Sequence, residues 1–122
     1  MLLLDIDADG DIDTFGDCLT ILKYVVGVRG AGLTDGTVLP TAPRHDPQEI
    51  EDYIRNIWYF LDVDGNGEVN TEDAVMIMLY RAGLRGVNLV GGRLSAGGVR
   101  NTAALVEAYC AHILSDLQKL SI

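Results

Sequence analysis

The chain contains the same short acidic loop twice. The first copy covers residues 5–17 and the second covers residues 62–73. In each copy oxygen-bearing side chains recur at alternate positions, a glycine occupies the sixth position, and a carboxylate closes the loop. Regularly spaced oxygen donors around a tight turn suit a large, hard cation. This duplicated pattern therefore constrains both the fold and the chemistry of the chain.

The similarity between the two halves extends beyond the loops. Asp5 aligns with Asp62, and Asp17 aligns with Asp73 after one residue that only the first loop carries. Further aligned pairs are Leu33 and Leu89, Arg44 and Arg100, Glu51 and Glu107, and Tyr53 and Tyr109. Self-similarity over this length indicates an internal duplication. We expect a single domain, residues 1–122, made of two repeats over about 1–57 and 58–119.

The spacing of apolar residues predicts four amphipathic helices. They cover about 17–26, 47–61, 71–82 and 101–119. The connectors at about 28–46 and 84–100 are rich in Gly, Pro, Thr and Ser, which indicates ordered turns rather than strands. The predicted fold is all-α. It consists of duplicated EF-hand-like loop–helix units with two additional amphipathic helices, related by a pseudo-two-fold axis.

The order of the helices predicts how they are placed around the loops. Helix 47–61 runs directly into the second loop, whereas no predicted helix precedes the first. We expect helix 101–119 to fold back into that missing place. Cys110 on this helix would then face Cys18 on helix 17–26. The two cysteines are either buried apolar side chains or the halves of a disulfide, and the sequence leaves both alternatives open.

Alternate positions of each loop supply the predicted metal ligands. In the first loop these are Asp5, Asp7, Asp9, the backbone carbonyl of Asp11, Asp13 and the closing Asp17. In the second loop they are Asp62, Asp64, Asn66, the backbone carbonyl of Glu68, Asn70 through a water, and the closing Asp73. The extra residue of the first loop is expected to bulge out within residues 14–16. The sequence thus predicts two bound Ca²⁺ ions, because Mg²⁺ resists giving up its waters to an all-protein cage.

The eighth position of each loop is apolar. It is Ile12 in the first copy and Val69 in the second. In paired calcium-binding loops the residues at this position form a short antiparallel contact that couples the two sites. We therefore expect Ile12 and Val69 to meet.

Both loops close with Asp, and each is followed by a short apolar helix. In these features residues 5–30 and 62–86 resemble dockerin repeats. The resemblance implies a calcium-dependent module of a secreted bacterial enzyme or scaffold, located outside the cell or at its surface. It also implies a helix face that binds a cohesin partner. The family's recognition positions correspond to Thr14-Phe15 and Thr71-Glu72.

Composition argues against several other classes of protein. A net charge of −9 disfavours binding to nucleic acid or anionic membranes. No segment approaches the roughly 20 apolar residues of a membrane span, so no membrane insertion is expected. Cys110 and His112 are two residues apart on a predicted helix and point in different directions. With no acid pair outside the two loops, the chain is expected not to be an enzyme.

These features favour a non-catalytic calcium-binding module that mediates protein–protein docking or assembly of a secreted bacterial protein. The alternative is a purely structural, calcium-stabilised appendage or spacer with no cohesin-type partner. A cytosolic calcium sensor and a small hydrolase are further hypotheses. The closing Asp residues argue against a sensor, because their side chains offer less of the bidentate reach that drives opening.

Overall fold

The structure, a computed structural model, describes residues 2–115. This part of the chain contains six α-helices, two other short helical segments and no β-strand, which confirms the all-α prediction for these residues. In chain order the elements are η1 (Thr14–Cys18), α1 (Leu19–Val25), α2 (Ala31–Thr34), α3 (Pro47–Ile57), η2 (Trp58–Leu61), α4 (Thr71–Arg81), α5 (Val87–Val90) and α6 (Ala103–Ile113). Residues 116–119 of the predicted last helix lie outside the described residues.

The four predicted helices are present with small changes at their ends. Helix α3 begins at Pro47 after an extended Asp46, as expected for a proline in the first turn. It ends at Ile57 and passes into the 3₁₀-helix η2, so the predicted helix 47–61 is two segments. Helix α4 begins with a capping box between Asn70 and Asp73. The connectors contain no strand, but each includes a four-residue helix, α2 or α5.

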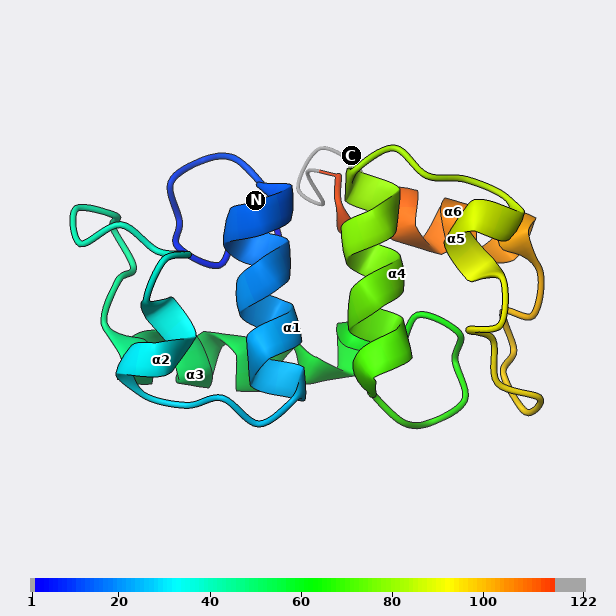
Figure 1. Cartoon of the computed structure of the whole chain (residues 1–122), viewed down its shortest axis with the longest axis horizontal. Coiled ribbons are helices and arrows are strands. Elements are labelled where there is room, and N and C mark those ends of the chain that lie inside the picture. The colour runs from blue at the N-terminus through cyan, green and yellow to red at the C-terminus, as the bar shows by residue number, and fades with distance from the viewer. Residues whose placement is uncertain (1, 116–122) are drawn as a thin grey trace, which may run out of the picture.

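Helices α1 and α4 pack side by side and run in opposite directions (Figure 1). As a result, the two acidic loops lie at opposite ends of this helix pair (Figure 1). Helices α2 and α3 pack with α1, and α5 and α6 pack with α4. The loops are therefore separated by the length of the central helices.

One buried apolar cluster contains residues from both halves of the chain. Its fully buried members include Leu4, Ile6, Ile21, Leu33, Ile50, Ile54, Leu61, Met76, Ile77, Leu89 and Ile113. Cys18 and Cys110 belong to the same cluster, and both are free thiols. Burial raises the pKa of each thiol to about 12, so both are protonated at neutral pH.

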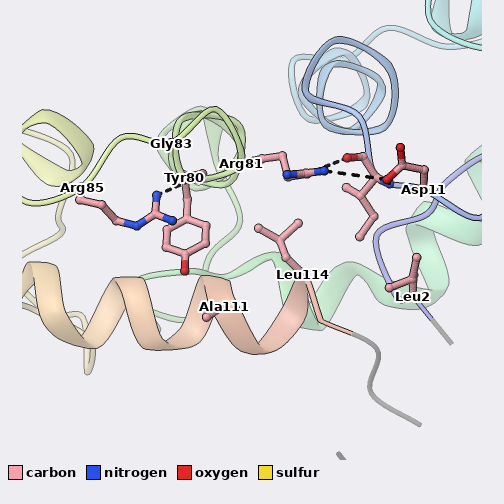
Figure 2. A pocket seen from close by; sticks show the side chains of 9 residues that line it. Leu2, Asp11, Tyr80, Arg81, Gly83, Arg85, Ala111 and Leu114 are labelled. Atoms are coloured by element: carbon pink, nitrogen blue, oxygen red, sulfur yellow. Dashed lines mark hydrogen bonds and ion pairs between the residues drawn. The ribbon is translucent and has the colours of Figure 1, made fainter. Parts of the chain in front are cut away.

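The last helix reaches the start of the first loop only with its C-terminal end. Ala111 and Leu114 line a hollow together with Leu2, just before that loop (Figure 2). The middle of α6 packs instead on its own repeat, where the Tyr109 hydroxyl donates to the carbonyl of Phe60 at 2.7 Å. The place before the first loop, predicted for the last helix, therefore lies beside α3 as well as the end of α6, because the Tyr53 hydroxyl of α3 donates to the carbonyl of Leu3 at 2.6 Å.

Candidate metal centre

Each loop is organised around its first acid. The carboxylate of Asp5 accepts hydrogen bonds from the backbone amides of Asp9 and Gly10 at 3.2 and 2.9 Å. Asp62 accepts from the residues four and five positions further on at the same two distances. The sixth-position residues, Gly10 and Gly67, have φ angles of +94° and +91°, which other residues rarely adopt. Glycine at this position lets the backbone turn back toward the first carboxylate.

The closing acid of each loop has a matching set of backbone partners. One oxygen of Asp17 accepts from the amide of Ile6 at 2.6 Å, and the other accepts from the amide of Asp13 at 2.9 Å. Asp73 accepts from the two equivalent amides at 2.8 and 2.9 Å. The exposed fractions of the two residues are only 2% and 0%. Both closing carboxylates are therefore held in place by backbone amides.

The extra residue of the first loop bulges outward within residues 14–16, as the sequence suggested. It is taken up in a π-helical turn, η1, in which the amide of Cys18 donates to the carbonyl of Asp13 five residues earlier, at 3.1 Å. In the second loop the equivalent bond, from Ala74 to Asn70, spans four residues. The wider turn leaves Phe15 74% exposed while Asp17 keeps its contacts. Loop length thus differs without displacing the closing acid.

The carboxylates of each loop converge. Within each group, one oxygen from every member lies within 4.8 Å of the others. The groups are Asp5, Asp7, Asp9 and Asp17 in the first loop and Asp62, Asp64 and Asp73 in the second. Two sites that could hold a metal ion are thereby formed from seven of the predicted ligand residues.

The remaining predicted ligands lie at the rim of these groups. The side chains of Asp11 and Glu68 are exposed, and the prediction assigned them their backbone carbonyls. Within residues 2–115 no backbone amide donates to either carbonyl oxygen. Asn66 is half-buried, and its side-chain oxygen accepts from the amide of Glu68 at 3.0 Å. Asp13 is exposed, and its backbone amide is the partner of the closing Asp17.

The surroundings of the Asp64 carboxylate indicate whether the residues of the second loop suit a cation. Asp64 is only 2% exposed, and its Oδ2 accepts from the amide of Ser95 at 3.0 Å. Its Oδ1 is buried and has no hydrogen-bond partner among the described residues. A buried carboxylate oxygen without a partner is unfavourable. A cation held between Asp64, Asp62 and Asp73 would satisfy it, so the donor set fits a hard metal ion.

Burial also disfavours ionisation of carboxylates in both loops. Desolvation, followed by the charge of Asp17, raises the pKa of Asp7 to about 7. Desolvation raises the pKa of Asp17 and of Asp73 to about 6, although the backbone amides that they accept from oppose this shift. Asp7 is therefore partly protonated near neutral pH, whereas Asp17 and Asp73 take up a proton as the pH falls toward 6. A bound dication would reverse this preference.

The predicted contact between the eighth-position residues does not form. Because α1 and α4 are antiparallel, the loops lie at opposite ends of the molecule (Figure 1), and within residues 2–115 no backbone hydrogen bond joins Ile12 to Val69. The carbonyl of Ile12 instead accepts from the side chain of Arg81 at 2.7 Å (Figure 2). The same guanidinium lies 3.9 Å from the carboxylate of Asp11. The first loop is thus tied to the far end of α4.

Arg44 and Arg100, which align between the two repeats, both bind the backbone of an acidic loop. Each donates to the first two carbonyls of its loop, at 3.2 and 2.8 Å for Arg44 and at 2.6 and 2.5 Å for Arg100. Their guanidinium groups lie 3.8 Å from the ring centroids of Tyr53 and Tyr109. The alignment of both arginines and both tyrosines between the repeats was the sequence feature that could have indicated this role. These residues attach each acidic loop to the second helix of its own repeat.

Comparisons with known proteins give no match. No family model matches the chain, and neither the curated proteins nor the solved structures include one that matches it. In the described part of the chain, no helix combines the length and the apolar character needed to cross a membrane. The interpretation of the two sites therefore depends on their residues and geometry.

Proposed function

We propose that the chain is a non-catalytic, dockerin-like module that binds two Ca²⁺ ions through duplicated EF-hand-like loops. The single observation that carries this proposal is the unpartnered, buried Oδ1 of Asp64, which lies within a group of three converging carboxylates. The first loop offers a comparable group of four. All-oxygen donor sets of this kind favour calcium over softer transition metals.

The residues of each loop have separate tasks in this proposal. Backbone amides hold the first and closing acids, so these carboxylates are pre-oriented. In the first loop Asp7 faces Asp17 and Asp9, and burial together with their charges raises its pKa. Calcium supplies the positive charge that offsets this repulsion and the cost of burial. Because the loops continue into η1 and α4, ion binding would also stabilise the start of each central helix.

Exposed apolar side chains next to the second loop support docking rather than a purely spacing role. Tyr59 and Phe60 precede Asp62 and are 88% and 40% exposed. Together with Val99, which is 70% exposed, they line one groove. Exposed aromatic residues that gather at one place are typical of interaction surfaces. We propose that this module docks onto a cohesin-like or other extracellular protein, in keeping with the dockerin resemblance.

Calorimetric titration of chelator-treated protein tests the calcium sites. We expect two Ca²⁺ ions to bind per chain with dissociation constants below 1 mM, a threshold of roughly the weakest extracellular calcium modules. At about 100 times the dissociation constant, each site would add about 2.7 kcal/mol to the free energy of unfolding. MgCl₂ is the matched control and should bind far more weakly. The absence of calcium binding at millimolar concentration would refute the proposal.

Docking is tested separately, by surface plasmon resonance against immobilised cohesin-like modules with and without calcium. A calcium-dependent complex that Tyr59→Ser weakens supports docking through the groove beside the second loop. A calcium-loaded protein that binds none of these modules would favour the structural spacer. The calorimetric and surface plasmon resonance experiments thus distinguish ion binding from partner binding.

A further inference from the structure

The second loop is held by a serine of its connector that has no equivalent at the first loop. The backbone amide of Ser95 donates to Oδ2 of Asp64 at 3.0 Å. The Ser95 hydroxyl accepts from the side-chain amide of Asn66 at 2.8 Å. Ser95 thus contacts two predicted ligands of one site with two different groups. Both contacts come from the connector, not from the loop itself.

The same segment continues along the loop backbone. The amide of Arg100 donates to the carbonyl of Asp64 at 2.9 Å, and the amide of Val99 donates to the carbonyl of Gly65 at 3.4 Å. Gly98 packs so closely that a Cβ atom added there would lie 2.6 Å from the Asp64 carbonyl oxygen. Residues 95–100 therefore run against the loop over several consecutive positions.

The first loop shares only part of this arrangement. The amide of Arg44 donates to the carbonyl of Asp7 at 2.9 Å, which matches the contact between Arg100 and Asp64. The position that aligns with Ser95, however, is occupied by Leu39, which is 71% exposed. Within residues 2–115 the side chain of Asp7 accepts a hydrogen bond from the backbone amide of Asp9, which belongs to the loop itself. The contacts of Ser95 are therefore an addition specific to the second repeat.

These contacts determine how the second set of ligands is presented. With Oδ2 of Asp64 bonded to Ser95, the other oxygen of this buried carboxylate is left without a partner inside the carboxylate group. The bond from Asn66 to the Ser95 hydroxyl fixes the orientation of the amide, so its oxygen stays on the loop side. Outer partners of this kind orient metal ligands and raise affinity.

We propose that Ser95 is a positioning residue of the second metal centre, whose hydroxyl holds Asn66 in the orientation that this loop needs to receive its cation. The inference rests on the proposed calcium-binding function. It predicts that the second loop binds Ca²⁺ with a contribution from the connector that the first loop lacks. It also predicts that calcium binding protects residues 95–100 along with the loop.

Amide resonances of the two sixth-position glycines test the proposal site by site. In ¹⁵N–¹H spectra, Gly10 reports on the first loop and Gly67 on the second during titration with CaCl₂ in competition with a chelator of known affinity. We expect Ser95→Ala to weaken the response of Gly67 about tenfold, the lower end of the effect of removing an outer-shell partner. The response of Gly10 should be unchanged, and Ser95→Thr, which keeps a hydroxyl, should restore most of the affinity.

Leu39→Ala is the matched control, because it truncates the equivalent position of the first connector and should change neither glycine. If Ser95→Ala folds poorly, Ser95→Gly removes the same hydroxyl while retaining the backbone amide. An unchanged Gly67 titration, or an equal loss at both glycines, would overturn the role of Ser95. A wild-type protein in which neither glycine responds to calcium would instead overturn the proposed function itself.

Discussion

The two loops build the same carboxylate arrangement with different charge and different outer support. The first has Asp9 and Asp13 where the second has Asn66 and Asn70, so it concentrates more negative charge. Each loop is held by an arginine of its own connector, but the first is tied in addition to the opposite repeat through Arg81, and the second to Ser95. What the loops share is the set of backbone amides on their first and closing acids. That shared set defines the cage, while charge and outer support vary around it.

Removing a closing acid should have the largest effect and test whether the loops are equivalent. Asp17→Ala and Asp73→Ala each leave buried backbone amides without acceptors, at about 1–3 kcal/mol per group. We expect a loss of about 3 kcal/mol in the free energy of unfolding for either variant, measured by chemical denaturation with chelator present. Losses that differ several-fold between the two variants would show that the shared backbone contacts are not the main determinant of loop stability.

The second-largest effect should be the pH dependence of stability in the metal-free protein, which tests the contribution of Asp7 in the first loop. The folded-state pKa of Asp7 is raised from 3.8 to about 7, so between these values the folded state retains a proton that the unfolded chain has released. Stability contributed by this proton is fully present below pH 3.8 and is lost as the pH rises to about 7. The metal-free protein should therefore melt at a lower temperature at pH 8 than at pH 5.

Asp7→Asn is the variant that checks this assignment, because it removes the titrating group and keeps an oxygen that can accept from Asp9. We expect its melting temperature, measured by circular dichroism in the presence of chelator, to depend less on pH than that of the wild type. An identical pH dependence in the two proteins would show that Asp7 does not titrate in this range. Asp64→Asn applies the same change to the equivalent position of the second loop.

The smallest effect should come from the contact between repeats. Arg81→Met removes the 2.7 Å bond to the Ile12 carbonyl, which should cost about 1 kcal/mol in denaturation experiments. The accompanying 3.9 Å approach to exposed Asp11 should add little. Arg55→Met is the matched control. It breaks the exposed ion pair with Asp52 and should change stability less than Arg81→Met does. Equal effects would show that Arg81 does not support the first loop.

The main helices and the acidic groups were predictable because their signals are local. The start of α3 follows from Asp46-Pro47, and alternate acids within one short loop meet whenever that loop closes. The four-residue helices α2 and α5 are too short to show a period. The failure of Ile12 to meet Val69 follows from the antiparallel packing of α1 and α4, a tertiary property that residue spacing does not encode.

The contact of Ser95 with the second loop was also beyond sequence analysis. Its aligned position carries Leu39, so the duplication gave no indication of a shared role. Arg44 and Arg100, in contrast, were visible as an aligned pair, and only the carbonyls that they bind had to come from the structure. Features common to both repeats are therefore easier to predict from one sequence than features present in a single repeat.

The widened turn over Thr14–Cys18 allows the inner and outer faces of the first loop to evolve separately. The additional residue is accommodated on the solvent side, where Phe15 projects, while Asp17 remains attached to Ile6 and Asp13. Substitutions at Phe15 can therefore change the exposed surface without displacing Asp17 behind it. The exposed side of this turn is thereby free to vary while the carboxylate behind it keeps its place.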